Sequence, residues 1–186
     1  MTELLFGAGI YTAPAIWDGD CFYPLRDNSF SLPKYLGNWH YLAGTEAPFS
    51  TQGCQCNVQV NHSLIENGKL FINGSCNVGS EEEKIIRFEA VPSTGVYGLE
   101  GAYRIDHPAE PKSPCPGPNY IVTDLTAHVA IVQSSNYSSL HLISTKPHMP
   151  GFIIKAWMRR AEILGLKKGK LKRLDHRACT EKSSGD

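Results

Sequence analysis

The chain has 186 residues, with 18 basic and 18 acidic side chains, so its formal charge is zero. This length fits one domain that buries roughly two thirds of its unfolded surface, and the balanced charge provides no general attraction to nucleic acid or to an anionic membrane. No stretch approaches the ~18 apolar residues of a membrane-spanning helix. We therefore expect no nucleic-acid partner and no transmembrane segment.

Residues 1–33 show no sustained hydrophobic periodicity and contain Pro14, Pro24 and Pro33. This composition predicts an extended N-terminal arm with Cys21 as its covalent anchor, followed by one folded domain over residues 34–186. The start MTELLFGAG lacks the basic n-region and the long apolar run of a signal peptide. We expect that a leader was removed and that Met1 was added for expression.

Strand-like patterns dominate the middle of the chain. Residues 34–44 alternate, and Asn67-Gly68 within NVQVNHSLIENGKLFINGSC is a strong hairpin signal, because a type I′ turn needs two residues that tolerate positive φ. Further strand-like stretches follow at 85–91, 96–105, 120–125, 128–133 and 139–144. About eight short strands with hairpin-length connections are typical of an antiparallel barrel or sandwich.

One helix is predicted over residues 151–165. Pro150 precedes it and Gly165 ends it, and an apolar stripe has the spacing of one helix face. The stripe consists of Ile154, Trp157, Met158, Ala161 and Leu164. It predicts a helix that lies against the outside of the barrel.

The six cysteines are Cys21, Cys54, Cys56, Cys76, Cys115 and Cys179. They lack the C-x-x-C spacing of a zinc site, so we predict disulfides and no metal site. Sequons at Asn61, Asn73 and Asn136 are candidate glycosylation sites. Both features indicate a secreted protein or one in the lumen of the secretory pathway.

The predicted hairpin limits the partner of Cys76. In a hairpin with a two-residue turn at Asn67-Gly68, facing residues have numbers that sum to about 135, which places Cys76 near positions 56–59. Cys76 is therefore expected to pair with Cys54 or Cys56.

Several ordered motifs resemble those of the lipocalins. KYLGNW at 34–39 resembles their G-x-W signature, and SLIENGKL, Thr123-Asp124 followed by AIVQ, and LISTKP continue the likeness from about Cys21 to Cys179. The chain most resembles apolipoprotein D-like lipocalins, in particular fungal secreted members with G-C-x-C and C-P-G-P-N-Y segments. The resemblance implies an all-β fold, an eight-stranded antiparallel up-and-down barrel with one C-terminal α-helix packed on its outside.

The resemblance also implies structural roles. The G-x-W tryptophan closes the barrel floor in that family, so Trp39 is expected to do so, with Gly37 allowing a close approach. The family arginine that stacks on this tryptophan is replaced by Thr145, followed by Lys146, and a lysine cannot reproduce a planar stacked guanidinium. The resemblance further implies that whichever of Cys54 and Cys56 is left by Cys76 pairs with Cys179. Cys21 and Cys115 then remain to pair with each other.

Strand pleating predicts which side chains face the interior. If Asn61 and Asn73 carry glycans and face outward, residues of opposite parity face inward. The resemblance adds positions on the last strand and at the closed end. The predicted ligand-binding residues are Tyr35, Tyr41, Val58, Val60, His62, Leu70, Ile72, His141 and Ile143. For His62 and His141, ligand contact and a core position bonded to a neighbouring strand remain equal alternatives.

Two functions are consistent with such an interior. The first is binding or carriage of a small hydrophobic molecule, such as a terpenoid, a polyketide or a fatty-acid-like compound. The second follows from the resemblance, because some fungal barrels of this kind are cofactor-free pericyclases of secondary metabolism, including hetero-Diels-Alder catalysts. Such a reaction needs orientation and one hydrogen-bond donor, for which His62, His141 and Tyr41 are candidates. No cofactor is expected, and an interaction protein that acts through its surface remains a third class.

Overall fold

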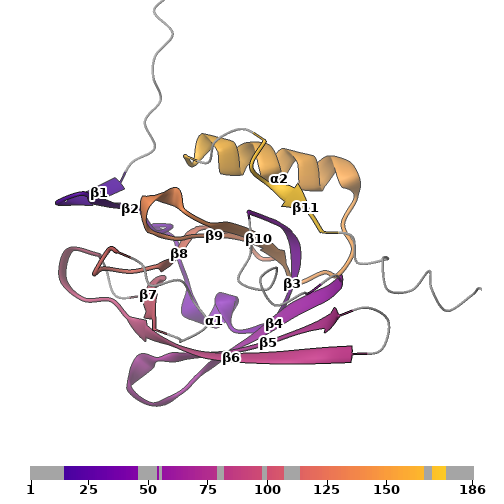
Figure 1. Cartoon of the computed structure of the whole chain (residues 1–186), viewed down its shortest axis with the longest axis horizontal. Helices are drawn as coiled ribbons and strands as arrows, with labels where there is room; N and C mark the ends of the chain where they lie inside the picture. The colour runs from indigo at the N-terminus through magenta and orange to yellow at the C-terminus, as the bar shows by residue number, and fades with distance from the viewer. Residues whose placement is uncertain are drawn as a thin grey trace, which may run out of the picture.

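A closed antiparallel barrel forms the body of the protein. The structure, a computed structural model, describes residues 15–45, 54, 56–78, 82–97, 100–106, 114–165 and 169–174. The barrel strands are β3 (Gly37–Gly44), β4 (Cys56–Leu64), β5 (Leu70–Val78), β6 (Glu82–Pro92), β7 (Ala102–Ile105), β8 (Tyr120–Leu125), β9 (Val129–Gln133) and β10 (Leu140–Ser144). Each pairs with the next in chain order, and β10 also pairs with β3, which closes the sheet (Figure 1). The predicted eight-stranded barrel is confirmed.

The hairpin between β4 and β5 forms at the predicted turn. Asn67 and Gly68 both have positive φ, 61° and 72°, as the Asn-Gly signal requires. The loop η2 (Glu66–Gly68) holds three residues instead of two, so the register differs by one residue and Asn61 faces Asn73. Cys76 is bonded to Cys54, with 5.6 Å between their Cα atoms, which selects one of the two expected partners.

The strand predicted over residues 96–105 is wrong in its first half. Residues 95–97 form the short 3-10 turn η3 (Gly95–Tyr97), and β7 begins only at Ala102. Gly95 and Gly101 have φ values of 65° and 88°, a backbone conformation outside the strand region. The β-rich composition of this stretch therefore does not extend the strand.

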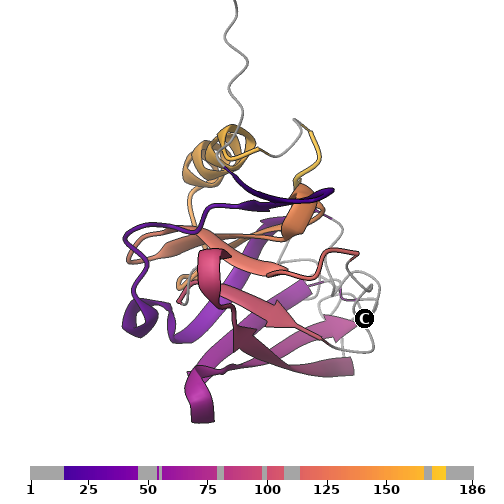
Figure 2. The ribbon, with the colours of Figure 1, turned by 90° about the vertical axis from the view of Figure 1, so that its left-hand side faces the viewer.

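Helix α2 (Gly151–Ile163) packs on the outer surface of the barrel, where β3, β9 and β10 meet. Ile154 and Ala161 are buried there, and Trp157, Met158 and Leu164 pack beside them, so the predicted apolar stripe is confirmed. Figure 2 shows the helix end-on, outside the barrel wall. Because this helix covers their outer face, β9 and β10 are buried on both sides and lose the alternation seen on β4.

The segment before the barrel forms a small hairpin, β1 (Ala15–Asp18) with β2 (Cys21–Pro24), and then the one-turn helix α1 (Leu32–Tyr35). The predicted Cys21–Cys115 disulfide is present. Near the C-terminus, β11 (Lys172–Arg173) pairs with the end of β3. Cys56 is also disulfide-bonded, but the expected partner Cys179 lies outside the described residues.

Candidate functional site

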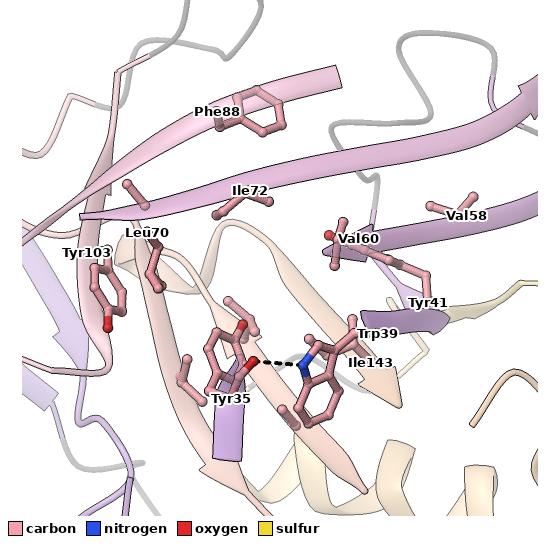
Figure 3. Close-up of a cluster of buried hydrophobic side chains, with 14 of the residues drawn as sticks. Tyr35, Trp39, Tyr41, Val58, Val60, Leu70, Ile72, Phe88, Tyr103 and Ile143 are labelled. Carbon is pink, nitrogen blue, oxygen red and sulfur yellow. Dashed lines mark hydrogen bonds between the residues drawn. The ribbon is translucent and has the colours of Figure 1, made fainter. Parts of the chain in front are cut away.

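Trp39 lies buried near the start of β3 beside helix α1, in a group of side chains that we call the floor of the barrel. Its side chain is 0% exposed, and its Nε1 donates a hydrogen bond of 2.8 Å to the carbonyl oxygen of Tyr35 (Figure 3). The ring of Tyr35 packs beside it, with 5.6 Å between ring centroids. Helix α1 thus supplies Tyr35, the residue that packs against the tryptophan.

The expected role of Gly37 needs correction. A Cβ added at this position would meet no atom within 4 Å, so no neighbour approaches closely enough to demand a glycine. The backbone there has φ of +105°, which L side chains rarely adopt. Glycine is therefore favoured at position 37 by the positive φ of the backbone at the start of β3. Lys146, which follows the position of the family arginine, is exposed.

A chain of hydrogen bonds extends from the floor into the interior. The hydroxyl of Tyr35 lies 2.6 Å from that of Tyr120, which lies 3.0 Å from Nε2 of His62. The rings of Tyr35 and His62 are stacked, with centroids 4.5 Å apart and planes at 18°. When a neutral His62 accepts from Tyr120, which in turn accepts from Tyr35, both hydroxyl protons and Nε2 of His62 have partners, and Nδ1 of His62 has none.

Burial keeps His62 neutral. Loss of solvation lowers its pKa to about 3, and the smaller influence of the Tyr35 backbone in the opposite direction does not offset this. Burial also raises the pKa of both tyrosines. The three groups therefore form an uncharged network at neutral pH, which is the form a low-dielectric interior tolerates.

A cavity of about 50 Å³ lies above this network, towards the loops that connect β7 to β8 and β9 to β10. Apolar side chains from five strands form much of its wall, and Tyr41, Tyr120 and His141 contribute polar groups. The lining residues are Tyr41, Val60, Ile72, Phe88, Ile105, Asn119, Tyr120, Val132, Gln133, Ser139 and His141. This volume is small for a binding pocket, since buried side chains occupy most of the barrel interior.

His141 differs from His62 in its surroundings. It is 6% exposed, and its ring lies 5.3 Å from that of Tyr41 at 60°. Its Nδ1 is buried and has no hydrogen-bond partner in the structure. Burial lowers the pKa of His141 to about 4, so it too is neutral at pH 7.

The structure places all nine predicted ligand-binding residues inside the barrel, where each is buried. Only Tyr41, Val60, Ile72 and His141 line the cavity. Tyr35, Val58, Leu70 and Ile143 belong to the surrounding core cluster, and His62 is hydrogen-bonded across the barrel to Tyr120. Whether any of the nine contacts a ligand stays a prediction.

Seven lining residues were not predicted from the sequence: Phe88, Ile105, Asn119, Tyr120, Val132, Gln133 and Ser139. Phe88 has the inward parity of β6, so the alternation that located Val60 and Ile72 could have found it. Val132 lies on β9, which is buried on both faces and shows no such alternation. Tyr120 stands where β8 begins, directly after a loop, and gives no such signal. Its contact with His62 exists only in the folded barrel.

Two general properties bear on the class of site. Among the described residues, none of the helices has the length and apolar character needed to cross a membrane. In the same part of the chain, histidine, cysteine and acidic side chains nowhere gather in a group of three or more that could ligate a metal ion. The polar side chains that line the cavity carry phenol, imidazole, amide and hydroxyl groups.

Comparison with known proteins gives consistent matches. Residues 30–176 match the model of the lipocalin-like domain. Apolipoprotein D of mouse is 36% identical over 52 residues, which are 28% of this chain and 26% of that protein. Apolipoprotein D of rat is 27% identical over 93 residues, 50% of this chain and 41% of that protein. The matched regions therefore span well under half the length of these curated relatives.

Solved structures share the fold at low identity. Lobster apocrustacyanin A1 superposes with a TM-score of 0.56 at 13% identity, covering 77% of this chain and 78% of that one. Apocrustacyanin C1 gives a TM-score of 0.55 at 12% identity, covering 76% and 77%. Together with the closed barrel, the G-x-W floor and the family match over most of its length, these findings show that the chain belongs to the lipocalin-like domain family.

Proposed function

We propose that the protein binds a small hydrophobic molecule inside the barrel. The observation that carries this is the cavity wall, in which Val60, Ile72 and Phe88 face a small, partly open space from three adjacent strands. Burying apolar ligand surface there contributes about 25 cal/mol per Å² before the costs of association. Binding of this kind requires no charged group in the wall.

The size of the cavity restricts the ligand. Drug-sized ligands occupy pockets of roughly 300 to 1,000 Å³, much larger than the space of about 50 Å³ present here. A terpenoid, polyketide or fatty-acid-like molecule therefore requires side chains of the cavity wall, such as Ile105 and Phe88, to change rotamer. A compact molecule or a narrow chain fits with the least rearrangement.

The test is displacement of an apolar fluorescent probe by hydrophobic compounds of graded size. Val60→Asp places an unpaired charge in the wall and is expected to abolish binding. Gln59→Asp places the same group on the exposed face of β4 and is the matched control. Because Val60→Asp can also unfold the barrel, Val60→Phe, which fills the cavity without charge, is measured alongside. If compounds of every size fail to enter the unmodified protein, the proposal is wrong.

A pericyclase is the second candidate, and the polar side chains in the mostly apolar cavity wall favour it. Tyr41 and His141 line the cavity, and a phenol or a neutral imidazole can donate a hydrogen bond. One such donor can polarise a carbonyl while the walls orient two reactive partners, which is sufficient for a hetero-Diels-Alder reaction. The Tyr120 hydroxyl is less suited to this role, because it is already bonded to His62 and Tyr35. The test is stereoselective product formation from a reactive precursor, lost in Tyr41→Phe or His141→Phe.

Secretion and glycosylation are part of the proposal. The disulfides fit an oxidising compartment. Asn61 and Asn73 lie opposite each other on the outer face of β4 and β5, where glycans would not enter the barrel. The Asn136 amide accepts from the Phe22 N–H at 2.8 Å and donates to Cys115 Sγ, so a glycan there competes with a structural contact. The mass lost on enzymatic deglycosylation counts the occupied sites.

A further inference from the structure

His141 lines the cavity, and one of its ring nitrogens has no partner. His141 is more than nine-tenths buried, and its Nδ1 has no hydrogen-bond partner in the structure. Buried polar atoms without partners are uncommon in folded proteins, and each destabilises the fold. An imidazole in a cavity wall whose hydrogen-bonding capacity the protein leaves unused is available to a molecule that enters the cavity.

His62 shows why the location matters. Its Nδ1 is also without a partner, but its Nε2 bonds to Tyr120 and its ring is stacked on Tyr35. His62 does not line the cavity, whereas His141 does. Of the two buried histidines, a ligand in the cavity therefore reaches His141.

The cavity wall carries no formal charge among the residues that line it, which are apolar, phenolic, amide, hydroxyl or imidazole side chains. His141 itself is neutral, because burial lowers the pKa of its imidazole to about 4. A carboxylate moved into this space would lose its hydration and gain no counter-charge, at a large cost in binding free energy. The site therefore discriminates against anionic ligands.

We propose that the ligand is a neutral, mostly apolar molecule with one hydroxyl or carbonyl group, and that this group hydrogen-bonds to the imidazole of His141. This inference rests on the proposed binding function and narrows its ligand class, because it excludes free fatty acids. A neutral imidazole can present either a lone pair or an N–H, so both alcohols and ketones are accommodated. The apolar body lies against Val60, Ile72 and Phe88.

The first experiment compares three probes with the same eight-carbon skeleton: 1-octanol, octanoate and octane. Affinities are measured with the full chain at pH 7.5 by displacement of the apolar fluorophore, below the solubility limit of each compound. We expect octanoate to bind at least tenfold more weakly than 1-octanol. Equal or tighter binding of octanoate overturns the inference and leaves the binding function intact.

The second experiment tests the residue. His141→Phe removes both ring nitrogens and should weaken 1-octanol about tenfold without weakening octane. His141→Asn keeps a polar atom near the position of Nδ1 and should retain most of the 1-octanol affinity. His128→Asn, at an exposed histidine in the turn before β9, is the matched control and should change neither.

The outcomes separate the two proposals. A loss in His141→Phe that is equal for 1-octanol and octane would assign His141 a packing role only and overturn the inference. If His141→Phe does not fold, the ratio of the 1-octanol and octanoate affinities of the unmodified protein still tests the inference. Failure of all three probes and of larger apolar compounds to bind overturns the proposed function itself.

Discussion

The floor and the cavity of this barrel contain the same kinds of side chain but use them differently. At the floor, the Trp39 indole, the Tyr35 and Tyr120 hydroxyls and Nε2 of His62 all have hydrogen-bond partners. Nδ1 of His62 has none, and neither has Nδ1 of His141, but only His141 lines the cavity. Polar groups that satisfy one another stabilise a fold, whereas an unsatisfied one on a residue that lines a space is available to a ligand. Location and the bond to Tyr120 therefore distinguish the structural His62 from the proposed binding residue His141.

The largest effect is expected at the floor itself. Trp39→Ala removes a fully buried indole and its hydrogen bond and should lower the free energy of unfolding by about 3 to 5 kcal/mol. Trp17→Ala is the control, because Trp17 is 73% exposed on β1. Urea denaturation measures both. Similar midpoints for the two variants would mean that the floor does not carry the stability assigned to it.

Acid should act on both regions through their histidines. Burial lowers the pKa of His62 to about 3 and of His141 to about 4, from an ordinary value of 6.5. Between these values the unfolded chain binds more protons than the folded one, so stability is full above pH 6.5 and falls as the pH decreases. At pH 5, each histidine lowers the free energy of unfolding by about 2 kcal/mol relative to pH 7. Their titratable ring neighbours are Tyr35, Tyr120 and Tyr41. Burial raises the pKa of Tyr35 and Tyr120, so these two hydroxyls stay neutral.

Thermal melting between pH 7 and pH 5 measures this loss, a range in which the lowered pKa of Asp27 keeps that carboxylate charged. His141→Phe should remove about half of the pH dependence and leave the share of His62. A variant as acid-sensitive as the unmodified protein would contradict the burial of a neutral His141.

The hydrogen-bond chain can be interrupted without removing a ring. Tyr120→Phe leaves the Tyr35 hydroxyl and Nε2 of His62 without their partner inside the barrel, and should cost about 2 kcal/mol. Tyr97→Phe removes an exposed hydroxyl bonded to Asp18 and serves as the control with a much smaller expected change. If the two substitutions cost the same in urea denaturation, the network at the floor adds nothing to stability.

The sequence predicted the parts of this comparison that depend on local patterns. Alternation on β4 and β5 located Val60 and Ile72, the Asn-Gly turn located the hairpin, and helical spacing located the face of α2. It could not predict that Tyr120 meets His62, because these residues are 58 positions apart and lie on strands that are not neighbours.

Nor could the sequence distinguish the two histidines. Both occupy inward positions on strands, and the difference between them arises from which side chains approach across the barrel. The family resemblance predicted that His141 faces the interior of the barrel, but it did not indicate that Nδ1 of His141 has no hydrogen-bond partner. The role of Gly37 was misjudged for a related reason, since a requirement for positive φ and a requirement for close approach favour the same residue.

The smallest predicted effect has the opposite sign to the others. Replacing His141 by Phe removes the unpartnered Nδ1 and leaves an apolar ring of similar shape beside Tyr41, so the free energy of unfolding should rise by about 1 kcal/mol at pH 7.5. His62→Phe is the matched variant and should destabilise the protein, because it takes a hydrogen-bond partner from Tyr120. Urea denaturation of both variants without ligand gives the two signs. If His141→Phe destabilises the protein as much as His62→Phe does, His141 is a structural residue like those of the floor. If His141→Phe instead raises the free energy of unfolding and weakens 1-octanol binding, His141 lowers the stability of the free protein in order to bind a ligand.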